Sequence, residues 1–284
     1  MNNESENKIG LPTDAGGLRI LCDEYGIRPR RERGQHFLVN RLVRQSLVDS
    51  AELKPTDIVL EIGAGLGHVT EALAECVQTV LAVEIDRRFI KCLTDQFGSN
   101  RRVRIIQDDI RELNLASLGL ADRGYKVVAN LPYNVTSLVI RKLLSELPRP
   151  TRLCLIIQKE VADRISAPVG ELSLLALSVQ FYAEAKMVRR ISTTSFWPRP
   201  LVESSLIVLE PRPAPLAVPE KKYFQVVKAA FAGKRKQLHN SLSRLTNSDS
   251  QKTADQLRQI GIDPTSRPQD LTLEKWLKIT QNIL

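Results

Sequence analysis

Val59-Leu60-Glu61-Ile62-Gly63-Ala64-Gly65-Leu66-Gly67 is the stretch of this 284-residue chain that decides its fold. Its apolar first half is typical of a parallel strand that is covered on both faces. Its glycines allow a sharp turn into a helix, and they let the backbone approach a ligand where a Cβ atom would stand in the way. The segment therefore predicts a strand, a ligand-binding turn and a helix.

A second apolar run ends at Glu84, where a carboxylate can accept hydrogen bonds from both hydroxyls of a ribose. The glycine spacing is G-x-G-x-G, whereas loops that bind a pyrophosphate usually show G-x-G-x-x-G. This spacing favours a ligand with adenosine but no pyrophosphate, such as S-adenosylmethionine. A glycine-rich turn without any ligand is the alternative, and the position of Glu84 argues against it.

Short β-rich runs alternate with helical patterns along most of the chain, which predicts a doubly wound α/β sheet. The β-rich runs are 58–61, 80–84, 103–106, 127–129, 153–157, 187–191 and 206–209. The helical patterns between them include 69–76, 87–97, 137–147, 160–165 and 172–182. A further helix is expected after Asn40, whose side chain can cap it.

Four prolines, at 211, 213, 215 and 219, indicate a linker after the last β-rich run. Only helical patterns follow, at 223–231, 236–245, 253–260 and 273–284. We therefore expect a flexible N-terminal arm over 1–29, a sheet domain over 30–211 and a small all-helical domain over 212–284.

The chain carries a net charge of +9 with a pI near 9.5, which points to a polyanionic partner. Residues 28–44 hold six arginines against one acid, and residues 221–244 hold seven basic residues and no acid. Nucleic acid is favoured over a membrane, because neither segment pairs its charge with a broad apolar face. No apolar run is long enough to span a bilayer, and the N-terminus does not resemble a signal peptide. The four scattered cysteines favour neither disulfides nor a metal site, so a cytoplasmic location is expected.

Two further polar groups follow apolar runs and should reach the same edge of the sheet. Asp108-Asp109 follows the third run, and Asp109 is our choice for a contact with an adenine amino group. The alternative is that this acid pair caps a helix or lies in a solvated turn. Asn130-Leu131-Pro132-Tyr133-Asn134 follows the fourth run, and a simple β-turn is the alternative there.

The residue types of this second motif suit methylation of an adenine amino group. That nitrogen is a poor nucleophile, because its lone pair is delocalised into the ring. The Asn130 side-chain oxygen and the Leu131 carbonyl can accept its two N–H groups and so expose the lone pair, while Pro132 sets the direction of the turn. Tyr133 can stack on a flipped base and align it with a sulfonium methyl group.

With these motifs in place, the chain from about residue 30 resembles the ribosomal RNA adenine N6,N6-dimethyltransferase family. The matching segments are the opening motif Gly34-Gln35-His36-Phe37-Leu38, the cofactor loop 61–67, the motif 130–134, the segment 158–164 and the late loop 196–204. The resemblance implies a class I, Rossmann-like methyltransferase sheet of seven strands whose last two form a reversed hairpin. It also implies that Phe196 faces the target base.

The same resemblance implies cofactor contacts at seven residues: His36, Leu38, Gly63, Gly65, Glu84, Asp109 and Asn130. It implies that the basic motif Lys234-Arg235-Lys236 opens the helical domain and binds RNA. The implied reaction is dimethylation of adjacent adenines near the 3′ end of small-subunit rRNA in a pre-ribosomal particle. We expect a monomer that needs neither a metal nor a membrane.

Besides DNA adenine methylation, which is disfavoured because nothing in the chain resembles a DNA target-recognition domain, two alternative functions remain open at this point. One is a large-subunit rRNA methyltransferase of the antibiotic-resistance type, which Asp263-Pro264 and Arg267-Pro268 disfavour by fitting the small-subunit pattern. The other is a non-catalytic assembly factor, which the intact motif at Asn130 disfavours. The stretch 167–172 is short beside the family pattern, so no substrate contact is assigned to it.

Overall fold

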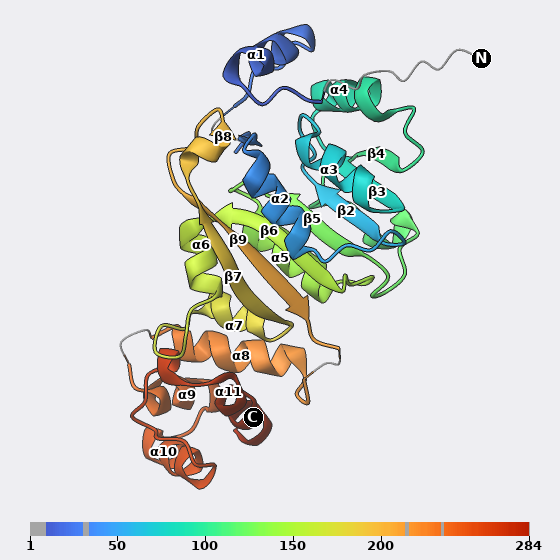
Figure 1. The fold of residues 1–284 in the computed structure, drawn as a ribbon. Helices are drawn as coiled ribbons and strands as arrows, with labels where there is room; N and C mark the ends of the chain where they lie inside the picture. Colours follow the sequence, from blue (N-terminus) through green and yellow to red (C-terminus); the bar gives the residue numbers. More distant parts are fainter. Residues whose placement is uncertain (1–9, 31–33, 214–215, 234–235, 284) are drawn as a thin grey trace, which may run out of the picture.

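The structure is a computed structural model that describes residues 10–30, 34–213, 216–233 and 236–283. Its centre is a seven-stranded sheet (Figure 1) built from β2 Ile58–Ile62, β3 Thr79–Glu84, β4 Val103–Gln107, β5 Lys126–Asn130, β6 Arg152–Gln158, β7 Ala183–Ile191 and β9 Ser204–Pro211. The strand order is β4-β3-β2-β5-β6-β9-β7. Neighbours from β4 to β6 pair in parallel, whereas β9 is antiparallel to both β6 and β7. The predicted seven strands and the reversed final hairpin are confirmed.

Three helices cover each face of this sheet. One face packs against α2 Arg41–Ser50, α3 His68–Cys76 and α4 Arg87–Phe97, and the other against α5 Thr136–Ser145, α6 Lys159–Ile165 and α7 Leu174–Gln180. Successive side chains of β2 point to opposite faces, so Val59 joins the first core and Leu60 the second. Both are fully buried, as the continuous apolar run predicts. The predicted cap of α2 is also present, because the Asn40 side chain accepts a hydrogen bond from the Val43 N–H.

Residues 10–29 differ from the flexible arm that the sequence suggests. They contain helix α1 Ala15–Glu24, which packs at the top of the molecule in Figure 1. Leu18, Cys22 and Ile27 are buried against four residues of the sheet region, namely Phe37, Leu66, Phe89 and Cys92. The expectation of an arm was wrong for these residues, because burial of an apolar stripe outweighs the low helix propensity of the glycines.

The C-terminal segment is helical, as predicted, and contains α8 Glu220–Phe231, α9 Leu238–Thr246, α10 Ser250–Gln259 and α11 Leu273–Asn282. Its core holds the fully buried Tyr223 and Trp276. The same core includes Ala176 and Leu177 of α7 and the adjoining Phe181, so the helical segment packs directly on one end of the sheet layer (Figure 1). The division into domains at 211 stays a prediction.

A small second sheet joins two motifs that lie far apart in the sequence. Strand β1 Phe37–Leu38 pairs antiparallel with β8 Phe196–Trp197, so that Leu38 lies opposite Phe196. The rings of Phe37 and Trp197 stack with their centroids 6.2 Å apart. This pairing brings the opening motif and the late loop to the carboxyl edge of the main sheet, where the ligands of open α/β folds bind.

Candidate active site

A cavity of about 760 Å³ opens at the carboxyl ends of β2, β3, β4 and β5. Its volume lies in the usual range for small-molecule sites. Its lining includes all seven predicted cofactor residues: His36, Leu38, Gly63, Gly65, Glu84, Asp109 and Asn130. The structure therefore brings together residues that come from four strands and from the opening motif.

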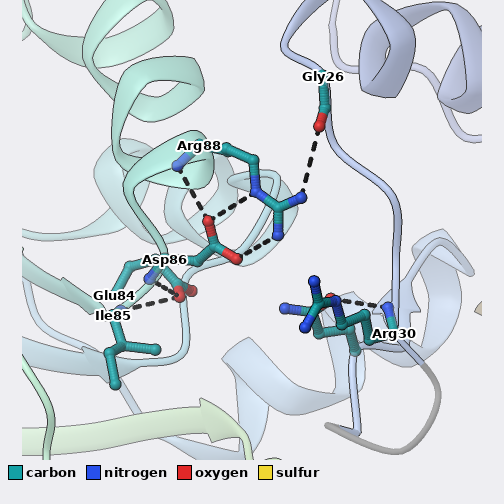
Figure 2. Close-up of polar contacts among 7 residues, drawn as sticks. Gly26, Arg30, Glu84, Ile85, Asp86 and Arg88 are labelled. Carbon is teal, nitrogen blue, oxygen red and sulfur yellow. Dashed lines mark hydrogen bonds and ion pairs between the residues drawn. The ribbon is translucent and has the colours of Figure 1, made fainter.

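Glu84 connects the glycine turn to the end of β3. One carboxylate oxygen accepts the Gly65 N–H at 2.9 Å, and the other accepts the N–H groups of Ile85 at 2.8 Å and Asp86 at 3.0 Å. Figure 2 shows the contacts with Ile85 and Asp86. Burial raises the pKa of this carboxyl, although the three N–H groups oppose the shift. The turn and its acid are thus held in one fixed arrangement beside the cavity.

The glycine turn needs residues without a side chain at two of its positions. Gly65 has a φ of +56°, and a Cβ there would lie 3.2 Å from the Phe37 ring. Gly67 has a φ of +90°, and a Cβ there would lie 2.6 Å from the Phe97 ring. Both positions therefore combine a left-handed backbone with a close approach to an aromatic ring. The sharp turn that the sequence predicted is present, whereas the close approach of its backbone to a ligand stays a prediction.

Next to Glu84, an ion pair ties the N-terminal segment to the cavity wall. Arg88 contacts both carboxylate oxygens of Asp86, at 3.0 and 2.6 Å, and donates at 3.4 Å to the carbonyl of Gly26 (Figure 2). At the other side, the His68 ring contacts the Pro12 carbonyl at 2.8 Å. These contacts lie at the two ends of the α1 segment, so both ends of the segment are anchored beside the cavity.

Asp109 lines the cavity with its carboxylate already paired. Both of its oxygens contact the Arg111 side chain, at 2.5 to 2.9 Å, and one accepts the Arg111 N–H. This guanidinium is the main reason that the pKa of Asp109 lies below its usual value. The carboxylate therefore stays ionised and oriented, and its role toward adenine stays a prediction.

Asn130 is oriented by the opening motif. Its Nδ2 donates to the His36 carbonyl at 2.8 Å. A backbone carbonyl can only accept, so this contact fixes which end of the amide faces His36 and leaves Oδ1 as an acceptor for another group. The His36 ring in turn contacts the Pro198 carbonyl through Nδ1 at 2.7 Å and stacks on Tyr133 at 5.7 Å. His36 thus connects the opening motif, the Asn130 motif and the late loop.

The other residues predicted to take part in catalysis do not all line the cavity. Pro132 lines the cavity, and the Tyr133 hydroxyl contacts Ser204 at 3.0 Å. Burial raises the pKa of this Tyr133 hydroxyl. Leu131 and Phe196 are buried, with Phe196 only 4% exposed in a core cluster, and neither lines the cavity. The Leu131 side chain needs no access, because its predicted role belongs to its carbonyl, whereas the role of Phe196 toward a base requires the ring to become accessible.

Of the three predicted RNA-binding residues, only Lys236 can be placed. Its side chain is exposed, and its backbone N–H bonds to the Gly233 carbonyl at 2.8 Å. Lys234 and Arg235 lie outside the described residues. Among the described residues there is no group of three or more His, Cys, Asp or Glu side chains arranged to hold a metal, and no helix that could cross a membrane.

Glu61 is a polar residue of the cavity to which the sequence assigned no role. It is 2% exposed and accepts a hydrogen bond from the Thr70 hydroxyl at 2.6 Å. Burial raises the pKa of its carboxyl to about 8, and the nearby Glu84 shifts the pKa in the same direction, whereas Thr70 opposes the shift. The sequence signal that could have identified Glu61 is an acidic residue near the end of a predicted buried strand.

This raised pKa predicts a pH dependence of stability. Because folding raises the pKa of Glu61 from 4.5 to about 8, its contribution to the free energy of unfolding is full below about pH 4.5 and is lost as the pH rises through 8. Glu61→Gln stays neutral throughout, so its melting temperature relative to the wild type should be higher at pH 8.5 than at pH 5.5. Glu75→Gln, on the exposed side of α3, is the control. Equal differences at both pH values would contradict the prediction.

The sheet order, the glycine turn with its acid and the polar Asn130 at the end of β5 together define a class I methyltransferase. The fold of the chain also resembles those of two solved structures. These are a dimethyladenosine transferase from Plasmodium falciparum (TM-score 0.74, 24% identity, 84% of this chain and 94% of that one) and the 23S rRNA methyltransferase ErmE (TM-score 0.72, 24% identity, 87% and 98%). At this identity, the likeness confirms the fold.

The chain belongs to the ribosomal RNA adenine dimethylase family, whose model matches residues 27–283. Its relatives include proteins named ribosomal RNA small subunit methyltransferase A. One from Dehalococcoides mccartyi is 36% identical over 94% of this chain and 92% of its own length. Another, from Halothermothrix orenii, is 33% identical over 94% of each chain. The family resemblance inferred from the motifs is confirmed, and with it the assignment of the chain as an rRNA adenine dimethyltransferase.

Proposed function

We propose that this enzyme dimethylates the N6 amino groups of adjacent adenines near the 3′ end of small-subunit rRNA in a pre-ribosomal particle. The observation that carries the proposal is the fixed orientation of Asn130, whose Nδ2 bonds to His36 and whose Oδ1 remains an acceptor at the cavity. The names of the relatives at 33–36% identity support the small subunit as the source of the RNA. A cytoplasmic location and a monomeric state accompany this proposal.

Methyltransferases of this family use S-adenosylmethionine, and the cavity residues fit that cofactor. The Glu84 carboxylate retains acceptor capacity for ribose hydroxyls beyond the three N–H groups that it already holds. Asp109 would accept from the adenine amino group, and Gly63 and Gly65 leave backbone room beside the ligand. When bound, the cofactor supplies a methyl group activated by a sulfonium centre.

The chain's own contribution to the chemistry is to position the target and shape its charge. We propose that Asn130 Oδ1 and the Leu131 carbonyl accept the two N–H groups of the target nitrogen, so that its lone pair points at the methyl group. Pro132 sets the turn, Tyr133 packs on the base, and Phe196 packs on it once its buried ring becomes accessible. No strong general base is required, because the nitrogen becomes acidic only after it has been methylated.

Methyl transfer onto isolated ribosomal subunits tests this function directly. Labelled cofactor is incubated with small and large subunits, and the rRNA is digested to nucleosides for mass spectrometry. We expect N6,N6-dimethyladenosine in the small subunit alone. Label in the large subunit would support the resistance-type activity instead, and binding to either subunit without label would support a non-catalytic assembly factor.

We also propose that residues 30–211 form the catalytic domain and that 212–284 form an RNA-binding domain. Replacing Lys234, Arg235 and Lys236 with alanine should weaken rRNA binding and reduce the slope of log affinity against log salt by up to about two units, since each phosphate contact contributes about 0.7. Cofactor affinity should not change, because no described residue of 212–284 lines the cavity. An unchanged salt slope would show that this patch does not contact phosphate.

A further inference from the structure

The loop between β8 and β9 presents one apolar side chain to solvent in an unusual setting. Leu201 is 92% exposed, the highest exposure of any large apolar side chain among the described residues, and the adjacent Val202 is also exposed. Isolated exposed leucines are ordinary on protein surfaces. What distinguishes Leu201 is therefore its position in the fold rather than its exposure alone.

This loop is fastened to the active-site motifs at its two ends. The Pro198 carbonyl contacts the His36 ring at 2.7 Å, and the Ser204 hydroxyl contacts the Tyr133 hydroxyl at 3.0 Å. Between them, the Glu203 carbonyl accepts the Lys159 N–H at 3.0 Å, and the two side chains form an ion pair at 3.1 Å. Leu201 is thus held outward by a short, anchored loop next to the residues that would receive the target adenine.

An adenine inside a base stack cannot reach a cavity at the end of a sheet, so it must leave the stack, which costs a few kcal/mol. Proteins that distort nucleic acids commonly insert apolar side chains such as leucine between bases to offset that cost. An exposed arginine, Arg199, lies two residues before Leu201 and suits the phosphates that flank such a position. The chemistry of this loop tip therefore matches a nucleic-acid stack.

We propose that Leu201 enters the rRNA base stack in place of the target adenine and keeps that base in the active site. The proposal rests on the proposed function, and it assigns to Leu201 a role in specificity for stacked RNA. The proposal predicts that Leu201 contributes to kcat/KM when neighbouring bases can close over the vacated position. It predicts no such contribution when those bases are missing.

Small subunits reconstituted from rRNA with a synthetic 3′ segment provide the test. One version carries the natural stack, and the other carries an abasic residue on each side of a single target adenine. Leu201→Ala should lower kcat/KM on the natural stack by about tenfold or more, the scale of the apolar burial lost when a leucine side chain is truncated. On the abasic version it should remain close to the wild type. Leu201→Met, which keeps an apolar side chain of similar size, should restore most of the activity.

Leu147→Ala is the matched control, because Leu147 is 62% exposed and lies beyond the end of α5, away from the cavity. Equal losses on both RNAs, or no loss on either, would overturn the proposal. A loss of affinity for the subunit with no dependence on the flanking bases would indicate a protein contact instead, which also overturns it. If the proposed function itself fails, the wild type will methylate neither RNA, so the two failures are distinguishable.

Discussion

Asn130→Ala is expected to lower turnover by about a hundredfold or more, the scale for loss of one preorganised electrostatic contact. The reason is that Asn130 is held by the His36 carbonyl before the substrate arrives, so its Oδ1 needs no reorganisation to accept from the target amino group. Single-turnover kinetics with saturating cofactor and small subunits measures the effect. Affinity for the subunit should change little, because phosphate contacts elsewhere dominate RNA binding.

Two companion variants sharpen this experiment. Asn130→Asp keeps an acceptor but cannot donate to the His36 carbonyl, so it should also be impaired although its side chain has almost the same shape. Asn100→Ala, in the turn before β4 at the opposite edge of the sheet, should leave turnover unchanged. Wild-type turnover in Asn130→Ala would mean that the motif is only a turn. A looser site is also expected to accumulate N6-monomethyladenine, since the second methylation requires the product to re-present its nitrogen.

The sheet was predictable because its signals are local. Each central strand contains a short apolar run, the turn at Gly63 to Gly67 follows β2 directly, and the acid Glu84 is the last residue of β3. The carboxyl ends of parallel strands share one edge, so these motifs had to meet there. The pairing of Asp109 with Arg111 is also local and was readable from the sequence, although it was not anticipated.

Three other features that were missed depend on contacts between distant segments. Helix α1 was obscured by Gly16 and Gly17, which lie in its first turn and donate to the Asp14 side chain, and its apolar stripe has meaning only against the residues that it covers. The burial of Phe196 follows from the pairing of β8 with β1. The contact of His36 with Pro198 also depends on that pairing, which no local sequence pattern predicts.

The burial of Phe196 also changes how its predicted role should be tested. Truncation of a nearly buried phenylalanine to alanine costs about 3–5 kcal/mol of stability through cavity formation alone. A slow Phe196→Ala variant would therefore not separate a contact with the base from a damaged core. Asn130 and Glu84 are better probes, because both present polar atoms to the cavity.

Glu84→Ala is expected to weaken S-adenosylmethionine binding by about 2 kcal/mol or more, which corresponds to roughly a thirtyfold increase in Kd. Isothermal titration calorimetry measures this change. The substitution also removes the acceptor for the N–H groups of Gly65, Ile85 and Asp86, so a loosened glycine turn could weaken binding without any contact between Glu84 and the ribose. Affinity for the natural cofactor alone therefore does not prove the contact.

A double-mutant cycle separates the two causes, with a cofactor analogue that lacks both ribose hydroxyls as the second change. If Glu84 binds the ribose, removal of the hydroxyls should cost the wild type a large part of its affinity and cost Glu84→Ala little. Glu75→Ala, on the exposed side of α3, should behave as the wild type does. Equal losses in the wild type and in Glu84→Ala would restrict Glu84 to holding the glycine turn, because a side chain that contacts the hydroxyls must be coupled to their removal.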